Sequence, residues 1–291
     1  MLDGFKEFME NELRLSENSI NSYYSDVKLY EKYYKESYAE ELKELVYADV
    51  KMYKQYLLNK STSPKTINRK LTSLRTYNEF LIQEKLQTEM VIKDRDFIKI
   101  QRNKLNNNII SVQDVNKIKH YAAKDIKASK RDFCFISILC YGGLRASEIT
   151  NIKIGDIRLN ERELYIVGKG EKFRTVVINN IMYFAIKDYL KERQQINTKN
   201  PYLFVSQKSI NTKKPVNRNF CNRILNKYKD LCKLEELHPH LLRHFYGSNA
   251  LHNAGYTIEQ VASQMGHSNI NTTKEYLDTE KEDMMALANK L

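Results

Sequence analysis

Hydrophobic residues in the first hundred positions recur at steps of three and four, the spacing of one face of an α-helix. One such stripe begins near Ser16 or Ser19, either of which can cap a helix. Its apolar and aromatic positions are Ile20, Tyr23, Tyr24, Val27, Tyr30 and Tyr34. A second helix is predicted over about 49–58, and a third after Ser63 and Pro64, a cap followed by a proline that suits the first turn. Residues 1–98 therefore predict a bundle of four to five helices.

The pattern stops at residues 99–109, which are polar, basic and rich in asparagine, and we interpret them as an interdomain linker. A second domain over 110–291 is predicted to be mostly helical. Its expected helices are 111–122, 130–141, a short one after Arg145, 180–195, 217–231, 241–254 and 257–265. Between Ile154 and Ile178 the period changes to two, with turn residues at 160–161 and 168–171. This change predicts a small three-stranded antiparallel sheet in a mainly α fold.

The 291 residues suffice for two domains with separate cores, and the 48 basic and 36 acidic side chains leave a net charge of +12. Residues 1–106 carry 19 basic and 17 acidic groups, whereas residues 107–291 carry 29 and 19. The positive excess therefore lies in the second domain, which favours a polyanionic partner there. No stretch resembles a signal peptide or a membrane span, so we expect a cytoplasmic protein with no membrane partner. The four cysteines form no CxxC pair and are expected to be reduced thiols, two of them in an apolar run.

Four residues near the C-terminus have the chemistry for attack on a phosphodiester: His240, Arg243, His267 and Tyr276. A tyrosine offers an oxygen nucleophile, an arginine neutralises phosphate oxygens, and histidines exchange protons or hydrogen bonds. His240 and Arg243 share one face of a helix that begins just after Pro239. His244, on the same helix, is expected to be a packing or surface group.

Two further cations, Arg145 and Lys169, and one carboxylate, Glu148, extend this set. Arg145 is either a structural residue at a helix start or a phosphate ligand whose guanidinium Glu148, one turn away, orients. Glu148 could instead pair with a surface lysine. Lys169 lies between two glycines in a turn, where it is either solvated or able to protonate a leaving 5′ oxygen.

A metal-dependent hydrolase is the main chemical alternative. Such an enzyme needs a cluster of carboxylates, or of histidine with carboxylate, to hold its metal ion. The candidate residues are cationic apart from Glu148, and in His238-Pro239-His240 a proline separates the two histidines. We therefore expect no metal and no other cofactor.

The predicted helix after Ser63 has an apolar face and a polar face. The polar face carries Lys65, Asn68, Arg69 and Arg75. Such a face is either simply solvated or laid in a DNA major groove, where Arg and Asn reach bases and Lys reaches phosphates.

Taken together these motifs resemble the tyrosine recombinase (phage integrase) family over nearly the whole chain. The segments 142–149, 238–244 and 265–276 are similar to its arginine, His-x-x-Arg and Gly-His…Tyr boxes, and 63–75 resembles the DNA-facing helix of its N-terminal, SAM-like core-binding domain. The size is similar to that of the Xer recombinases and of transposon resolvases, with no room for an arm-binding domain.

The resemblance implies a role for each residue and a reaction without ATP or metal. Tyr276 would form a 3′-phosphotyrosine, Arg145, Arg243 and His267 would stabilise the transition state, Lys169 would be the general acid and His240 would handle the tyrosine proton. Glu148 would support them, and strand exchange would pass through a Holliday junction. The expected partners are double-stranded DNA with an inverted-repeat core site and a homo-tetramer on two sites, or a second recombinase. An apolar tail over about 280–291 either packs on its own domain or, as the resemblance implies, docks on a neighbouring protomer.

Several alternatives remain open at this point. Within the family, the task is resolution of dimers or of transposon cointegrates, or integration of a phage or transposon. Outside it, a type IB-like topoisomerase would use a similar site without strand exchange, and a DNA-binding protein could retain the fold without catalysis.

Overall fold

A computed structural model describes residues 2–100, 110–124, 129–168 and 173–266 of the chain. The chain divides into two compact units, Met1–Asn103 and Lys104–Leu291. The division falls within the segment 99–109, most of which lies outside the described residues, so the exact domain bounds 1–98 and 110–291 stay predictions.

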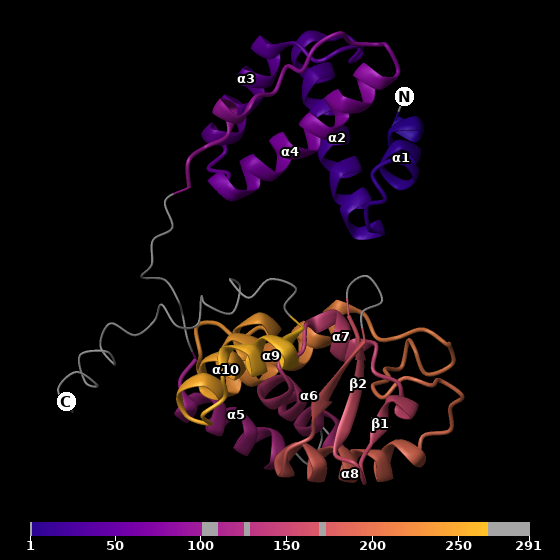
Figure 1. Ribbon diagram of the computed structural model, residues 1–291, viewed down its shortest axis with the longest axis vertical. Coiled ribbons are helices and arrows are strands. Elements are labelled where there is room, and N and C mark those ends of the chain that lie inside the picture. Colours follow the sequence, from indigo (N-terminus) through magenta and orange to yellow (C-terminus); the bar gives the residue numbers. More distant parts are fainter. Residues whose placement is uncertain (1, 101–109, 125–128, 169–172, 267–291) are drawn as a thin grey trace, which may run out of the picture. The chain divides into compact units, whose positions relative to one another are not determined.

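The N-terminal unit is a helical bundle (Figure 1). Its elements are α1 (Leu2–Asn11), α2 (Glu17–Tyr38), α3 (Tyr47–Asn59), α4 (Pro64–Gln83) and the short 3₁₀ helix η1 (Asp94–Asp96). Both predicted caps are confirmed, because the hydroxyl groups of Ser16 and Ser63 accept hydrogen bonds from the first turns of α2 and α4. The sequence pattern did not predict α1 explicitly, although Phe5 and Met9, one turn apart, are fully buried.

One core holds this bundle together. Most of the predicted stripe of α2 points inward, with Val27 and Tyr30 fully buried and Ile20 nearly so. Ile67, Leu71, Leu74 and Tyr77 of α4 meet it from the other side. The apolar face predicted for α4 is therefore confirmed.

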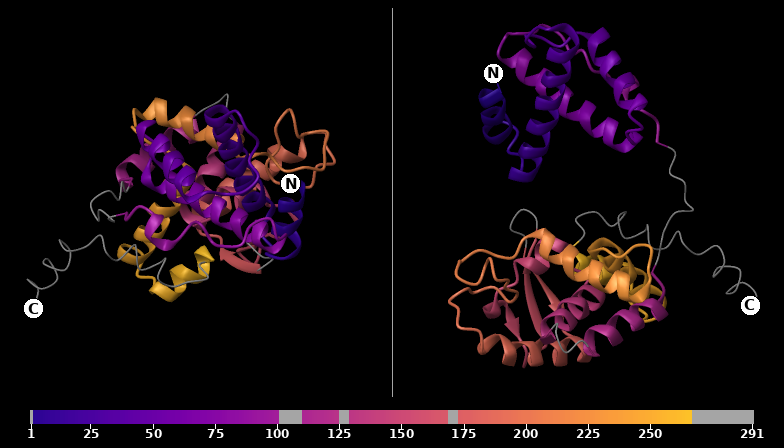
Figure 2. Two further views of the ribbon diagram at one scale, coloured as in Figure 1. Left: turned by 90° about the horizontal axis from the view of Figure 1, so that it is seen from above. Right: turned by 180° about the vertical axis from the view of Figure 1, so that it is seen from behind.

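The C-terminal unit is helical apart from one small sheet, which confirms the predicted fold class. Its elements are α5 (Val112–Lys124), α6 (Ser129–Gly142), α7 (Ala146–Thr150), η2 (Ile154–Asp156), β1 (Ile157–Arg158), β2 (Glu163–Val167), β3 (Phe173–Val177), α8 (Asn180–Gln194), α9 (Arg218–Cys232), α10 (Pro239–His252) and α11 (Ile258–Met265). Figure 1 shows the sheet on one side of this unit and helices α5, α9 and α10 on the other, and the view from behind in Figure 2 agrees.

The sheet is an antiparallel meander in the order β1-β2-β3. Leu164 of β2 lies opposite Val176 of β3, and both are buried, as is Ile166. Because side chains alternate along a strand, Ile166 and its cross-strand partner Arg174 lie on the same inward face. An arginine therefore lies on the core-facing side of β3.

The cysteines are free thiols, and Cys134, Cys140 and Cys221 are buried, which fits the expectation of reduced core residues. Burial raises the pKa of the Cys140 thiol to about 12, so this group stays protonated at neutral pH. No helix in the described ranges is long and apolar enough to cross a membrane.

Candidate active site

Arg145 stands at the start of α7, directly after a tight turn that leaves α6. Gly143 in this turn has a φ of +61°, and a Cβ there would lie 2.5 Å from the ring of Tyr246 on α10. Only glycine meets both demands, the left-handed backbone and the close approach of α10. The turn therefore places Arg145 beside α10.

Glu148 is the carboxylate around which the site is built, and only 6% of the residue is exposed. It accepts hydrogen bonds from the backbone N–H and the Nη1 of Arg145, at 2.8 and 2.9 Å. The Nη1 and Nη2 of Arg174 donate to its two oxygens at 3.0 and 2.8 Å, and Nη1 of Arg243 lies 3.9 Å away. Three guanidinium groups thus surround one carboxylate, so the alternative of a surface lysine partner for Glu148 is wrong.

The protonation of Glu148 follows from these contacts. Burial alone would raise its pKa, but hydrogen bonds and charge from Arg174 and Arg145 outweigh burial and lower the pKa to about 2. The carboxylate is therefore ionised at neutral pH. One anion among three cations leaves a net positive charge for an anionic ligand.

Arg243 extends from α10 into the same cluster, and only 3% of it is exposed. It donates to the carbonyl of Gly143 at 2.5 Å and to the carbonyl of Met265 at 2.9 Å. Arg145 also reaches Met265, at 3.5 Å, and donates to the carbonyl of Gly266 at 3.2 Å. The two predicted arginines therefore meet at the end of α11, directly before His267.

Sequence reasoning missed Arg174. Its Nε donates to the carbonyl of Gln264 at 2.8 Å, in addition to its paired contact with Glu148. A signal was present in the period-two pattern, because Arg174 falls on the same face as Val176 and Ile178. A charged residue on a core-facing strand position requires a buried partner of opposite charge.

His240 lies in the first turn of α10 and is exposed. Its Nε2 lies 2.9 Å from the Nε2 of His244, one turn further on. His244 is half buried, as expected of a packing group, but the expectation missed this direct contact with His240. Burial and the neighbouring His240 lower the pKa of His244 to about 4, so His244 is neutral at physiological pH. His238 caps the helix, because its Nδ1 accepts from the N–H of Leu241.

Three predicted site residues, Lys169, His267 and Tyr276, lie outside the described residues, as does the predicted tail over about 280–291. Lys169 belongs to the segment that joins β2 to β3. His267 follows Gly266, which ends α11 with a φ of +65°. In the sequence, Lys169 therefore lies five residues before Arg174, and His267 directly follows Gly266, to which Arg145 donates.

The polar face of α4 is engaged within its own unit. Asn68 exchanges two hydrogen bonds of 2.8 Å with the backbone of Ile98, and Arg75 donates to Asp94 at 2.7 Å. Arg69 pairs with buried Asp26 and with Ser22, yet 45% of its side chain is exposed. Lys65 is exposed. The structure thus places Lys65 and Arg69 at the surface and gives Asn68 a structural partner.

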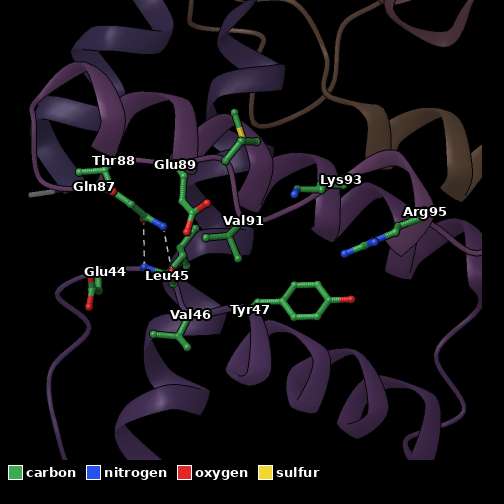
Figure 3. A pocket seen from close by; sticks show the side chains of 11 residues that line it. Glu44, Leu45, Val46, Tyr47, Gln87, Thr88, Glu89, Val91, Lys93 and Arg95 are labelled. Carbon is green, nitrogen blue, oxygen red and sulfur yellow. Dashed lines mark hydrogen bonds between the residues drawn. The ribbon is translucent and has the colours of Figure 1, made fainter.

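The N-terminal unit also contains a cavity of about 390 Å³. Figure 3 shows Gln87 at its wall, where the buried side-chain amide binds both the N–H and the carbonyl of Leu45. Glu44 and Glu89 line it near this contact, with Lys93 and Arg95 elsewhere on the wall. Within the described ranges, no residue predicted for catalysis or for DNA contact lines this cavity.

In the described ranges no three His, Cys, Asp or Glu side chains are grouped so that they could hold a metal ion. The cluster contains a single carboxylate and three guanidinium groups, a donor set that suits an anion.

Comparison with known proteins identifies the family of the chain. Residues 108–283 match the phage integrase family, and residues 2–85 match the phage integrase N-terminal SAM-like domain. The chain belongs to the phage integrase family. Its enzyme class is therefore that of the tyrosine recombinases, and the resemblance noted in the sequence is confirmed.

Relatives in this family align over almost the whole chain. The TnP I resolvase of Bacillus thuringiensis is 36% identical over 99% of this chain and 97% of its own length. The tyrosine recombinase XerD of Rickettsia bellii is 31% identical over 94% and 92%. None of these relatives is a topoisomerase, so the topoisomerase alternative is not favoured.

Two solved structures share the fold of this chain. The integrase of transposon Tn1549 in complex with a circular intermediate DNA superposes with a TM-score of 0.73 at 18% identity, covering 98% of both chains. The XerH recombinase bound to a palindromic difH substrate gives a TM-score of 0.71 at 19% identity over 92% of this chain and 78% of that one.

Proposed function

We propose that this recombinase cuts DNA with Tyr276 as its nucleophile. The tyrosine oxygen forms a bond to the scissile phosphorus while the bond from phosphorus to the 5′ oxygen breaks. His240 takes the tyrosine proton, and Lys169 gives a proton to the leaving 5′ oxygen. The product is a 3′-phosphotyrosine and a free 5′ hydroxyl. The 5′ hydroxyl of the second strand then attacks this phosphorus, which joins the strands and releases the tyrosine oxygen.

The observation that supports this function most is the convergence of Arg145 and Arg243 on the carbonyl of Met265, two residues before His267. The side chains of Arg145 and Arg243 are thereby close enough to contact one phosphate, and His267 is the third proposed donor, which follows in the sequence. Each donor aimed at the pentavalent transition state typically contributes about 3–4 kcal/mol. Glu148 supports the arginines and is not itself a proposed phosphate contact.

The DNA partner is supported by the charge distribution and by the DNA that relatives hold in their solved structures. Lys65, Asn68, Arg69 and Arg75 are the proposed contacts of the N-terminal unit. Among them Lys65 and Arg69 are exposed, but Arg69 also pairs with Asp26. Asn68 would first have to release Ile98, and Arg75 would have to release Asp94.

Resolution of transposon cointegrates is the biological task we favour, because a resolvase is similar over the full length at 36% identity. The proposed assembly is a homo-tetramer on two inverted-repeat core sites, with strand exchange through a Holliday junction and tails over about 280–291 joining the protomers. A second recombinase as partner is the alternative. Such a reaction takes place in the bacterial cytoplasm, at the nucleoid.

Covalent trapping tests the chemistry. The protein is incubated with nicked suicide duplexes from its host element in the presence of a chelator, and a protein–DNA adduct is expected. Tyr276→Phe should abolish the adduct, whereas Tyr256→Phe, a control tyrosine in the same unit, should retain it. An absent adduct in the natural chain, or an undiminished one in Tyr276→Phe, contradicts the proposed mechanism.

Two-site substrates test the biological reaction. A plasmid with two directly repeated sites should yield two circles, whereas a plasmid without a site should keep its supercoils. Relaxation of the plasmid without a site would indicate the topoisomerase alternative.

A further inference from the structure

Arg174 is a largely buried member of the arginine cluster. Only 11% of its side chain is exposed, compared with 41% for Arg145. Its Nε, Nη1 and Nη2 all donate to partners inside the protein. Both terminal nitrogens of Arg174 are held by Glu148 and its Nε is held by Gln264, so its part in the reaction can be traced through these two partners.

One of these partners is Glu148. The contact is bidentate, with both terminal nitrogens of the guanidinium on both carboxylate oxygens at 3.0 and 2.8 Å. This parallel arrangement fixes the plane of the carboxylate as well as its position. Glu148 in turn holds Arg145 by its backbone N–H and its guanidinium. The orientation of Arg145 therefore depends on a carboxylate that Arg174 aligns.

The other partner is the last turn of α11. Arg174 binds the carbonyl of Gln264, and the side chain of Gln264 accepts from the N–H of Val177, so β3 is joined to α11 twice. Gly266 packs on Arg174 so closely that a Cβ would lie 2.8 Å from its Nη1. The carbonyl of Met265, which receives Arg243, lies between these two contacts. Arg174 therefore also holds the segment on which Arg243 rests.

The charge of Arg174 has a further effect. Glu148 also lies 3.9 Å from Arg243, so without a third cation its charge would be shared by the two arginines proposed to bind phosphate. Arg174 neutralises Glu148, and the other two guanidinium groups keep their attraction for a phosphate.

We propose that Arg174 is a positioning residue of the recombination reaction: by aligning Glu148 and the end of α11, it holds Arg145 and Arg243 in the geometry that meets the scissile phosphate. This inference rests on the proposed function, in which those two arginines bind the phosphate. Lysine does not replace Arg174, because an ammonium group keeps the charge but lacks the planar fork.

The test separates DNA binding from cleavage. Affinity for a duplex carrying the host element's core site and the single-turnover rate of adduct formation at saturating protein are measured for the natural chain, Arg174→Gln and Arg174→Lys. We expect both variants to bind DNA within about twofold of the natural chain and Arg174→Gln to cleave about 100-fold more slowly, the loss typical of one misplaced transition-state donor. Arg158→Gln, an exposed arginine of the same sheet, is the matched control and should leave both quantities unchanged.

A double-mutant cycle identifies the route of the effect. If Arg174 acts in part through Glu148, the loss of cleavage rate in the variant Arg174→Gln/Glu148→Gln should be clearly smaller than the product of the two single losses, because the two losses are not independent. Multiplied losses in the double variant would overturn the inference, as would cleavage by Arg174→Gln within threefold of the natural rate. A parallel loss of DNA binding and cleavage would indicate a purely structural role and would also overturn it.

Two safeguards keep the outcomes distinct. If Arg174→Gln does not fold, the same criteria apply to Arg174→Lys, for which a slower cleavage with unchanged DNA affinity is required. If the natural chain itself forms no adduct, the proposed function fails. Failure of the inference alone leaves that adduct intact.

Discussion

Replacing Glu148 with glutamine should destabilise the C-terminal unit in a way that depends on pH. The natural carboxylate has a pKa of about 2 in the folded chain and an ordinary value of 4.5, a difference worth about 3 kcal/mol. A lowered pKa means that the contribution is complete above about pH 4.5 and is lost as the pH falls towards 2. About 2 kcal/mol of it should be gone by pH 3.

The variant removes this contribution and leaves buried cations without an anion. The side chains of Arg174 and Arg243 are 11% and 4% exposed, so water cannot replace the carboxylate. Removing one partner from such a buried group typically costs about 3–5 kcal/mol. We therefore expect Glu148→Gln to lose at least about 3 kcal/mol of unfolding free energy at pH 7, and less at pH 3.

The loss of unfolding free energy is measured by urea unfolding at pH 7 and pH 3. Hydrogen exchange of peptides from α7, β3 and α11 assigns the loss to the C-terminal unit. Glu161→Gln, which replaces an exposed carboxylate between β1 and β2, is the control and should have little effect. Two results would refute the reasoning: a loss below about 1 kcal/mol at pH 7, or an equal loss at both pH values.

Three other substitutions test separate contacts. Gly266→Ala places a methyl group 2.8 Å from a guanidinium and strains a φ of +65°, so Tm and the cleavage rate should fall, whereas Gly155→Ala, with no described heavy atom within 4 Å of the new Cβ, should change neither. Asp26→Asn removes the buried carboxylate of three side chains in the N-terminal unit and should lower its unfolding free energy in urea by about 3 kcal/mol; a loss below about 1 kcal/mol would contradict this. The pKa of His244 is lowered to about 4 in the folded chain, whereas its ordinary value is 6.5. As the pH falls below about 6.5 the unfolded chain binds a proton that the folded chain does not, so Tm should drop in that range. His244→Asn should flatten this part of the curve, and an unchanged slope would mean that His244 does not titrate as the contact with His240 implies.

Much of the secondary structure was predictable because its causes are local. The step of three and four residues, the serine caps of α2 and α4 and the period of two across the sheet act over a few neighbouring positions. The helix of residues 2–11 was not predicted from the sequence, because it is short and carries only two fully buried side chains.

The site was partly predictable for a different reason. Arg145, Glu148, His240 and Arg243 belong to motifs whose spacing already implies a common face or turn. Arg174 and the contact of His244 with His240 were not predicted. A prediction of the role of Arg174 requires knowing that Glu148 lies beside it in the fold. A prediction of the histidine contact requires the rotamers of two rings on neighbouring helical turns.

The sequence by itself determined the order of the helices and strands, the family and the residue types of the reaction, because these depend on local spacing and on motifs. Only the tertiary structure decided that three arginines from α7, β3 and α10 share Glu148 and that two of them share the carbonyl of Met265. The residues involved are up to 120 positions apart, and only packing of the whole unit brings them together. Burial then makes the charges interact strongly enough to define one arrangement.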